Sequence, residues 1–123
     1  STPSPVRSVG IVEGVSLAEA KRSLPPDADV RVTEHPRGVL FDYATAAGML
    51  AREQGRRGFL VFRDPEDNDG WFSCVVYEPG KAAASYSPVR PDPNRPSLDN
   101  ILGETTLEGI VRVLQIPGEL LGL

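Results

Sequence analysis

The sequence predicts one α+β domain: a central, mostly antiparallel sheet built on a hairpin at residues 59–77, with helices packed on it. Two aromatic and β-branched runs at the ends of that segment give the strongest strand signal in the chain. Three stretches, near 17–23, 43–54 and 106–116, carry helical periodicity or capping residues. Helices packed on an antiparallel sheet are typical of the α+β class.

Length and composition favour a single domain over residues 1–123. Hydrophobic residues make up 40% of the chain and charged residues 24%, which allows both a buried core and a soluble surface. The single cysteine, Cys74, cannot form an internal disulfide, and the longest apolar run is far below the ~20 residues of a spanning helix. We expect residues 1–5 to be a frayed polar lead without a signal core. These features predict a cytoplasmic, bacterial-style protein that contacts no membrane and needs no cofactor.

The chain opens with a strand and a short helix. Residues 6–12 are apolar enough for a first strand. Ser16 and Glu19 have the spacing of a capping box, in which the Ser16 hydroxyl accepts from the Glu19 amide and Glu19 reaches back to the Ser16 amide. A helix over 17–23 should follow, and a proline pair ends it.

A second strand, a third strand and a helix come next. Residues 29–35 alternate apolar and polar side chains, and 39–41 is a short apolar strand. Asp42 is a favourable N-cap for a helix over 43–54. That helix is rich in alanine and glycine, which lets it lie close to a sheet or a ligand. Gly55 is a natural stop past its C-terminus.

The two strands of the hairpin, 58–63 and 71–77, are apolar on both faces. Such strands are typical of the covered centre of a sheet. Their connector is rich in turn residues, and Asp69-Gly70 favours the positive φ angles of a hairpin turn. The aromatic residues Trp71, Tyr77 and Tyr86 lie on or beside the hairpin, as core residues or as interface anchors.

The last third of the chain contains a strand, a loop and a helix. Residues 81–87 suit an edge strand, and the four prolines of 88–97 predict an extended surface loop. Thr105 and Glu108 form a second capping box for the helix near 106–116. That helix has an apolar stripe made of Leu107, Ile110, Val111 and Leu114.

The acidic turn is a candidate binding surface. It carries four carboxylates within six residues: Asp64, Glu66, Asp67 and Asp69. Aligning the EF-hand glycine on Gly70 places Pro65 and Val76 at the outer ligand positions, so the turn lacks the oxygen set of a calcium site and we predict no metal. The turn is either a solvated hairpin tip or, with Trp71, a contact surface for a basic partner.

Other residues offer weaker chemistry. Catalysis by Cys74 would need the only histidine, His35, on an adjoining strand. A ligand pocket would lie between the Ala-rich helix and the sheet, near those two residues together with Asp42 and Tyr43. The segment 55–58 carries two arginines and two glycines that could hold an anion, but it lacks the P-loop lysine and spacing. The arginines there favour a role at the negative end of the preceding helix.

Charge narrows the function further. A net charge of −4 and a pI near 4.9 argue against a nucleic-acid binder and favour a basic protein partner. We therefore expect a non-enzymatic binding or regulatory protein, such as an acidic inhibitor, adaptor or immunity-type partner. The alternatives are a small-molecule-binding domain or minor enzyme, and a structural subunit of a homo-oligomer. The apolar tail from Leu114 to Leu123 would either fold back on the sheet or form a homodimer.

Overall fold

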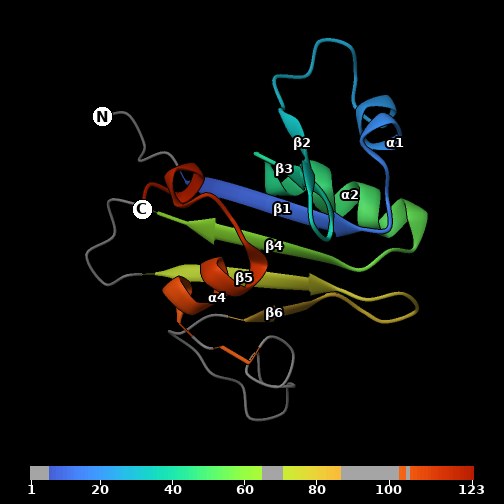
Figure 1. The fold of residues 1–123 in the computed structure, drawn as a ribbon. Coiled ribbons are helices and arrows are strands. Elements are labelled where there is room, and N and C mark those ends of the chain that lie inside the picture. Colours follow the sequence, from blue (N-terminus) through green and yellow to red (C-terminus); the bar gives the residue numbers. More distant parts are fainter. Residues whose placement is uncertain (1–5, 65–70, 87–102, 105) are drawn as a thin grey trace.

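Six strands of the described residues form one antiparallel sheet in the order β2-β3-β1-β4-β5-β6 (Figure 1). The structure, a computed structural model, describes residues 6–64, 71–86, 103–104 and 106–123. The strands are β1 (Arg7–Glu13), β2 (Val32–His35), β3 (Gly38–Phe41), β4 (Gly58–Arg63), β5 (Phe72–Tyr77) and β6 (Ala84–Tyr86). The predicted hairpin is the pair β4–β5, in a register that runs from Gly58↔Tyr77 to Arg63↔Phe72.

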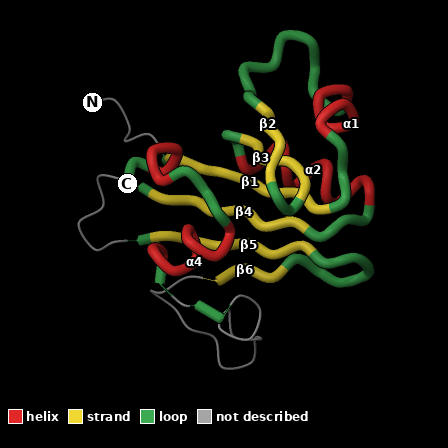
Figure 2. Tube along the Cα trace, in the orientation of Figure 1, coloured by secondary structure: helices red, strands yellow, loops and turns green. Residues whose placement is uncertain are grey.

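Helices cover both faces of this sheet, which confirms the predicted α+β class (Figure 2). The helix α2 (Ala44–Gln54) packs on one face, chiefly over β1 and β4, and α1 (Leu17–Arg22) lies beside β2 and β3. The helix α4 (Leu107–Leu114) and the 3-10 helix η1 (Gly118–Leu121) pack on the other face, the near one in Figure 1. We call these the α2 face and the α4 face.

Strand alternation separates the two apolar layers as the sequence predicts. Phe59 and Val61 of β4 belong to the layer under α4, whereas Leu60 and Phe62 face α2. The α2 helix lies so close to β1 that a Cβ added at Gly10 would collide with the Cβ of Ala47. The small residues of α2 therefore bring the helix close to the sheet.

Two helix starts differ from the prediction. Asp42 does not cap α2, because its Oδ1 accepts from the Arg31 amide at 2.8 Å and so joins the edge of β2 to β3. Tyr43 occupies the N-cap position without a side-chain bond, and the Ala44 amide donates instead to the Ser8 hydroxyl at 3.0 Å. Tertiary contacts thus replace the local cap.

The other helix start is α4, where the cap is Thr106. Its hydroxyl accepts from the Gly109 amide at 3.1 Å, one residue later than the predicted box at Thr105 and Glu108. Thr105 lies outside the described residues. Glu108 stands in the first turn of α4, where a carboxylate matches the positive end of the helix dipole.

The first capping box forms as predicted on one side only. The Ser16 hydroxyl accepts from the Glu19 amide at 3.2 Å. The Glu19 carboxylate accepts from the Ser16 hydroxyl at 3.0 Å rather than from the Ser16 amide. At the C-terminus of the next helix, α2, Gly55 adopts a left-handed φ of 61°, which confirms the predicted helix end.

The apolar tail folds back on the α4 face. Leu114, Ile116 and Leu121 are buried against β1 and β4 residues. The Arg63 Nη1 donates to the carbonyls of Leu121 and Gly122, at 2.7 and 2.9 Å. The predicted edge strand appears as β6, and the predicted frayed lead 1–5 and loop 88–97 lie outside the described residues.

No helix within the described ranges combines the length and apolar character that crossing a bilayer requires.

Candidate functional site

The strand β5, which lies one strand in from the edge strand β6, is fully covered on one face only. Its α4-face residues Phe72, Cys74 and Val76 are buried. Its α2-face residues Val75 and Tyr77 are half-buried, because α2 lies chiefly over β1 and β4. The prediction of cover on both faces therefore holds more fully for β4 than for β5.

This uncovered strip of sheet forms a groove of about 450 Å³ along α2, which we call the α2–β5 groove. Its floor comes from β4 and β5 and consists of Leu60, Phe62, Val75 and Tyr77. Its wall comes from α2 and consists of Thr45, Gly48, Met49, Arg52 and Glu53. The groove thus combines an apolar floor with a wall that mixes apolar and charged side chains.

Helical spacing builds the wall. Thr45, Met49 and Arg52 follow one another at i, i+4 and i+7, so they share one face of α2. Met49 is 59% exposed, and its flexible thioether can adapt to partners of different shape. At Gly48 an added Cβ would lie 3.0 Å from Leu60 Cδ1 and 3.2 Å from the Tyr77 hydroxyl. The glycine therefore lets the tyrosine lie against the helix at one end of the floor.

Polar groups of the groove are available to a ligand. The side chains of Thr45, Arg52 and Tyr77 make no hydrogen bond or ion pair within the part of the chain that the structure describes. Glu53 adds an exposed carboxylate beside them. An occupant could therefore bury apolar surface on the floor and satisfy hydrogen bonds at the rim.

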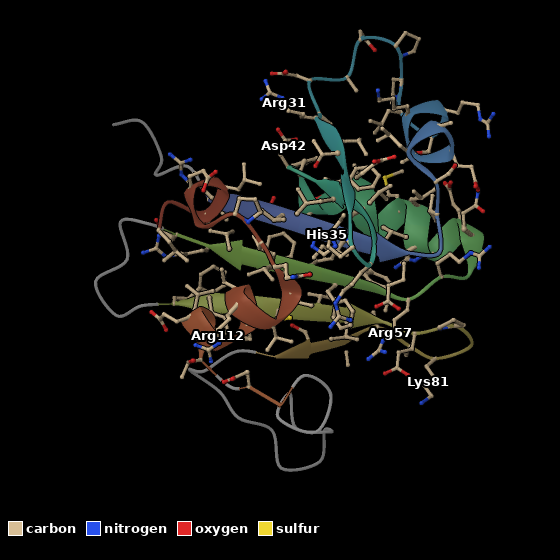
Figure 3. The ribbon with its side chains drawn as sticks, in the orientation of Figure 1. Arg31, His35, Asp42, Arg57, Lys81 and Arg112 are labelled. Carbon is tan, nitrogen blue, oxygen red and sulfur yellow. The ribbon has the colours of Figure 1, made fainter. Side chains whose placement is uncertain are left out.

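His35, which the sequence analysis placed near a pocket, lies elsewhere. Its Nε2 donates to the Leu114 carbonyl at 2.7 Å, and its Nδ1 accepts from the Arg37 amide at 3.1 Å. These two bonds use both ring nitrogens of the neutral imidazole. His35 (labelled in Figure 3) therefore ties the edge strand β2 to the end of α4.

Cys74 does not meet His35. Three strands separate β2 from β5, so the adjoining strands that a Cys74–His35 dyad requires are absent from the described sheet. Cys74 is fully buried on the α4 face, and this burial raises the pKa of its thiol to about 12. A thiol in that setting is protonated at neutral pH and is a poor nucleophile.

The remaining predicted pocket residues are also separate from the groove. Asp42 bonds the Arg31 amide, and Tyr43 is exposed at the start of α2. The groove does lie between the Ala-rich helix and the sheet, as predicted. Its lining, however, contains none of the four predicted residues, Asp42, Tyr43, His35 and Cys74. The sequence feature that could have indicated the observed lining is the i, i+4 and i+7 spacing of Thr45, Met49 and Arg52, which places three exposed residues on one face of α2.

The predicted partner surface is described only in part. Glu66, Asp67 and Asp69 lie outside the described residues. Asp64 and Trp71 are half-buried at the ends of β4 and β5. Asp64 follows the groove residue Phe62 by two positions, or roughly 7 Å along a strand, so the acidic turn begins at the Phe62 end of the groove.

Among the described residues, no three His, Cys, Asp or Glu side chains gather closely enough to hold a metal ion. Of the predicted aromatic anchors, Tyr77 is a floor residue of the groove and Trp71 is half-buried, while only the backbone of Tyr86 is described.

Comparison with protein-family models, with curated proteins and with solved structures finds no match to this chain, so its function is inferred from its own residues and their geometry.

Proposed function

We propose that this protein is a non-enzymatic binding protein whose α2–β5 groove receives a segment of a partner protein. The observation that supports this most directly is the apolar floor of Leu60, Phe62 and Val75 beside polar side chains that make no hydrogen bond or ion pair with other described residues. Protein interfaces commonly combine a buried apolar anchor with a polar rim. The groove offers both on one side of the molecule.

An apolar side chain of the partner supplies the affinity. Burying a leucine or phenylalanine side chain is worth about 1.5–3 kcal/mol. Met49 and Tyr77 can close around such an anchor, because both are partly exposed at the groove. The hydroxyl of Tyr77 and the guanidinium of Arg52 can then bind the partner's backbone carbonyls.

The partner is expected to be basic next to its anchor. The chain has a net charge of −4, and its sequence places four carboxylates in the turn that begins at Asp64. Complementary charge speeds encounter and fixes orientation more than it adds affinity. An acidic inhibitor, adaptor or immunity-type partner of a basic protein fits this arrangement.

A displayed library of random peptides tests the proposal at low salt. We expect the protein to select peptides with one large apolar residue flanked by lysine or arginine. Met49→Lys should abolish the selection, because it places a charge in the groove wall without touching the core. Tyr43→Ser is the matched control, since Tyr43 is also exposed on the start of α2 but does not line the groove. Peptides that bind Met49→Lys as well as the wild type would place the binding surface elsewhere.

A small apolar molecule is the second candidate occupant. The groove volume of about 450 Å³ falls within the roughly 300–1,000 Å³ of small-molecule sites. Saturable fragment binding that Met49→Lys removes, with no peptide selected in the same conditions, would favour this function over the first.

A further inference from the structure

Arg57 was predicted to lie at the negative end of α2, but its side chain lies on the opposite face of the sheet. It directly precedes β4, and its guanidinium lies over the ring of Phe59, at 5.0 Å from the ring centre. Phe59 belongs to the apolar layer under α4, whereas α2 packs on the opposite face. Arg57 therefore does not serve the C-terminus of α2.

The position of this guanidinium is fixed by stacking. The Phe59 ring is only 1% exposed, and the Arg37 guanidinium approaches the same ring at 5.6 Å. The Nε of Arg57 is buried and has no hydrogen-bond partner among the described residues. Nε is the one nitrogen of this half-buried side chain that is both buried and without a partner, so its two terminal Nη groups, which also make no bond to described residues, reach solvent. A planar group stacked on a buried ring is held ready for binding.

Within the described part of the chain, no neighbouring carboxylate is left to pair with Arg57. The sheet register brings carboxylates to either side of it: Glu13 on β1, whose amide donates to the Arg57 carbonyl at 2.9 Å, and Glu78, one residue beyond the Gly58↔Tyr77 pair. Each is engaged by another cation. Glu13 pairs with Arg37 at 3.1 Å, and Glu78 pairs with Lys81 at 3.4 Å.

The cluster therefore has three cations and two carboxylates, which leaves one positive charge. No ion pair or side-chain hydrogen bond of Arg57 occurs within the described chain. Figure 3 shows Arg57 and Lys81 at the end of the sheet opposite to Arg112. Arg112, in contrast, is paired with Glu104 at 2.9 Å.

We propose that Arg57 is an oxyanion-binding residue that takes a carboxylate or phosphate group end-on through its two Nη groups. Guanidinium and carboxylate or phosphate form two parallel hydrogen bonds, which are stronger than neutral ones. The Phe59 ring supports the guanidinium from below, and the engaged state of Glu13 and Glu78 leaves its charge for an external anion. This site lies on the α4 face and is independent of the α2–β5 groove.

Side-chain NMR of the full chain tests this site with simple probes. The Nε–H signal of Arg57 is followed while sodium phosphate or sodium acetate replaces sodium chloride at constant ionic strength. We expect a saturable shift of this signal and none for Arg112. Tighter saturation by phosphate identifies a phosphate ligand, and tighter saturation by acetate identifies a carboxylate ligand. A drift without saturation, or equal shifts of both arginine signals, would overturn the proposal.

Variants separate the fork of Arg57 from general charge. Arg57→Gln should abolish the saturable response, read at the Gly58 amide, and Arg57→Lys should weaken it about tenfold because lysine lacks the planar fork. Arg56→Gln is the matched control, since it removes the same charge from the neighbouring exposed residue. Equal weakening by Arg56→Gln and Arg57→Gln would show attraction by net charge alone and contradict a site at Arg57. If Arg57→Gln proved misfolded by its NMR spectrum, the wild-type titration would still decide.

Discussion

Individual residues of this chain are governed by contacts distant in the sequence. Asp42 has the right chemistry and position for a helix N-cap, yet its carboxylate bonds the Arg31 amide across the edge of the sheet. His35 has no local partner that the sequence reveals, yet it bonds a carbonyl 79 residues away. Side-chain type could be read from the sequence, but the partner depends on strand register, which only the fold sets.

We predict that His35 holds the C-terminal helix against the edge strand. Its Nε2 donates to Leu114 at 2.7 Å, and its Nδ1 accepts from Arg37. His35→Ala should lower the free energy of unfolding by about 1–3 kcal/mol, because two partly buried backbone groups lose their hydrogen-bond partner. Urea denaturation measures this, with the exposed Glu34→Ala as the neighbouring control. Equal stabilities of the two variants would contradict the role.

We predict that Cys74 is chemically silent in the folded protein. Burial raises the pKa of its thiol to about 12, from 9.0, so the thiolate is scarce at neutral pH. Because the folded pKa is the higher one, the associated stability is complete below pH 9.0 and is lost as pH rises toward about 12. Iodoacetamide should label Cys74 only on unfolding, and rapid labelling of the native protein at neutral pH would refute the prediction.

At the scale of elements, the strands of the hairpin were predictable and the groove was not. The strand β4 (Gly58–Arg63) matches its predicted bounds because apolar alternation and flanking glycine mark it directly. The groove exists because α2 lies over β1 rather than β5, and that position depends on the contact of Gly10 with Ala47. Such a contact joins distant parts of the chain and leaves no periodic signal. The orientation of Arg57 was missed for the same reason.

We predict that Thr106 caps α4. Its hydroxyl accepts from the Gly109 amide at 3.1 Å. Thr106→Ala should lower the free energy of unfolding by about 1 kcal/mol, and Thr106→Ser should restore it, because serine keeps the hydroxyl. Thermal unfolding of the pair tests this. A loss with Thr106→Ser as large as with Thr106→Ala would point to packing rather than capping.

We also predict that Gly48→Ala lowers the affinity for peptides without lowering the stability of the fold. Alanine favours a helix interior over glycine by about 1 kcal/mol, which offsets the crowding of Leu60 and Tyr77. The new methyl group would narrow one end of the groove. Peptide affinity should therefore fall while the unfolding midpoint stays close to the wild type, as titration and thermal melts would show. Unchanged affinity would exclude the Tyr77 end from the contact.

At the scale of the whole molecule, the two faces of the sheet are covered to different extents. The apolar residues of the α4 face are covered by α4, η1 and the folded-back tail, whereas the α2 face remains partly open beside β5. The sequence indicated both layers through strands with two apolar faces. The sequence could not show that the helices cover one face of the sheet more completely than the other, because this depends on where each helix packs. The acidic balance of the chain was evident from its composition.

We predict that charge, rather than the tail, controls association. Reversing the charges of Asp67 and Asp69 should weaken partner binding at low salt and flatten its salt dependence, because electrostatic attraction between the two surfaces is reduced. Titrations at two salt concentrations test this. Affinity that does not change at low salt would remove the acidic turn from the interface.

The tail has its own test. Truncation after Leu114 would remove the core residues Ile116 and Leu121, so a surface change is the sharper choice. Leu123 is half exposed, and we expect Leu123→Ser to leave the mass measured by light scattering unchanged. A fall in mass would instead support the homodimer through the tail.

The contact of η1 with β1 also sets an order of events during folding. Leu121 packs in the same layer as Val9 and Ile11, so one side of the first strand waits for residues more than a hundred positions later (Figure 1). On a ribosome, β1 can pair with β3 and β4 while that side is still bare. Exposed apolar strand surface favours aggregation, so this side of β1 stays open to aggregation, and to chaperones, until the residues of η1 have emerged.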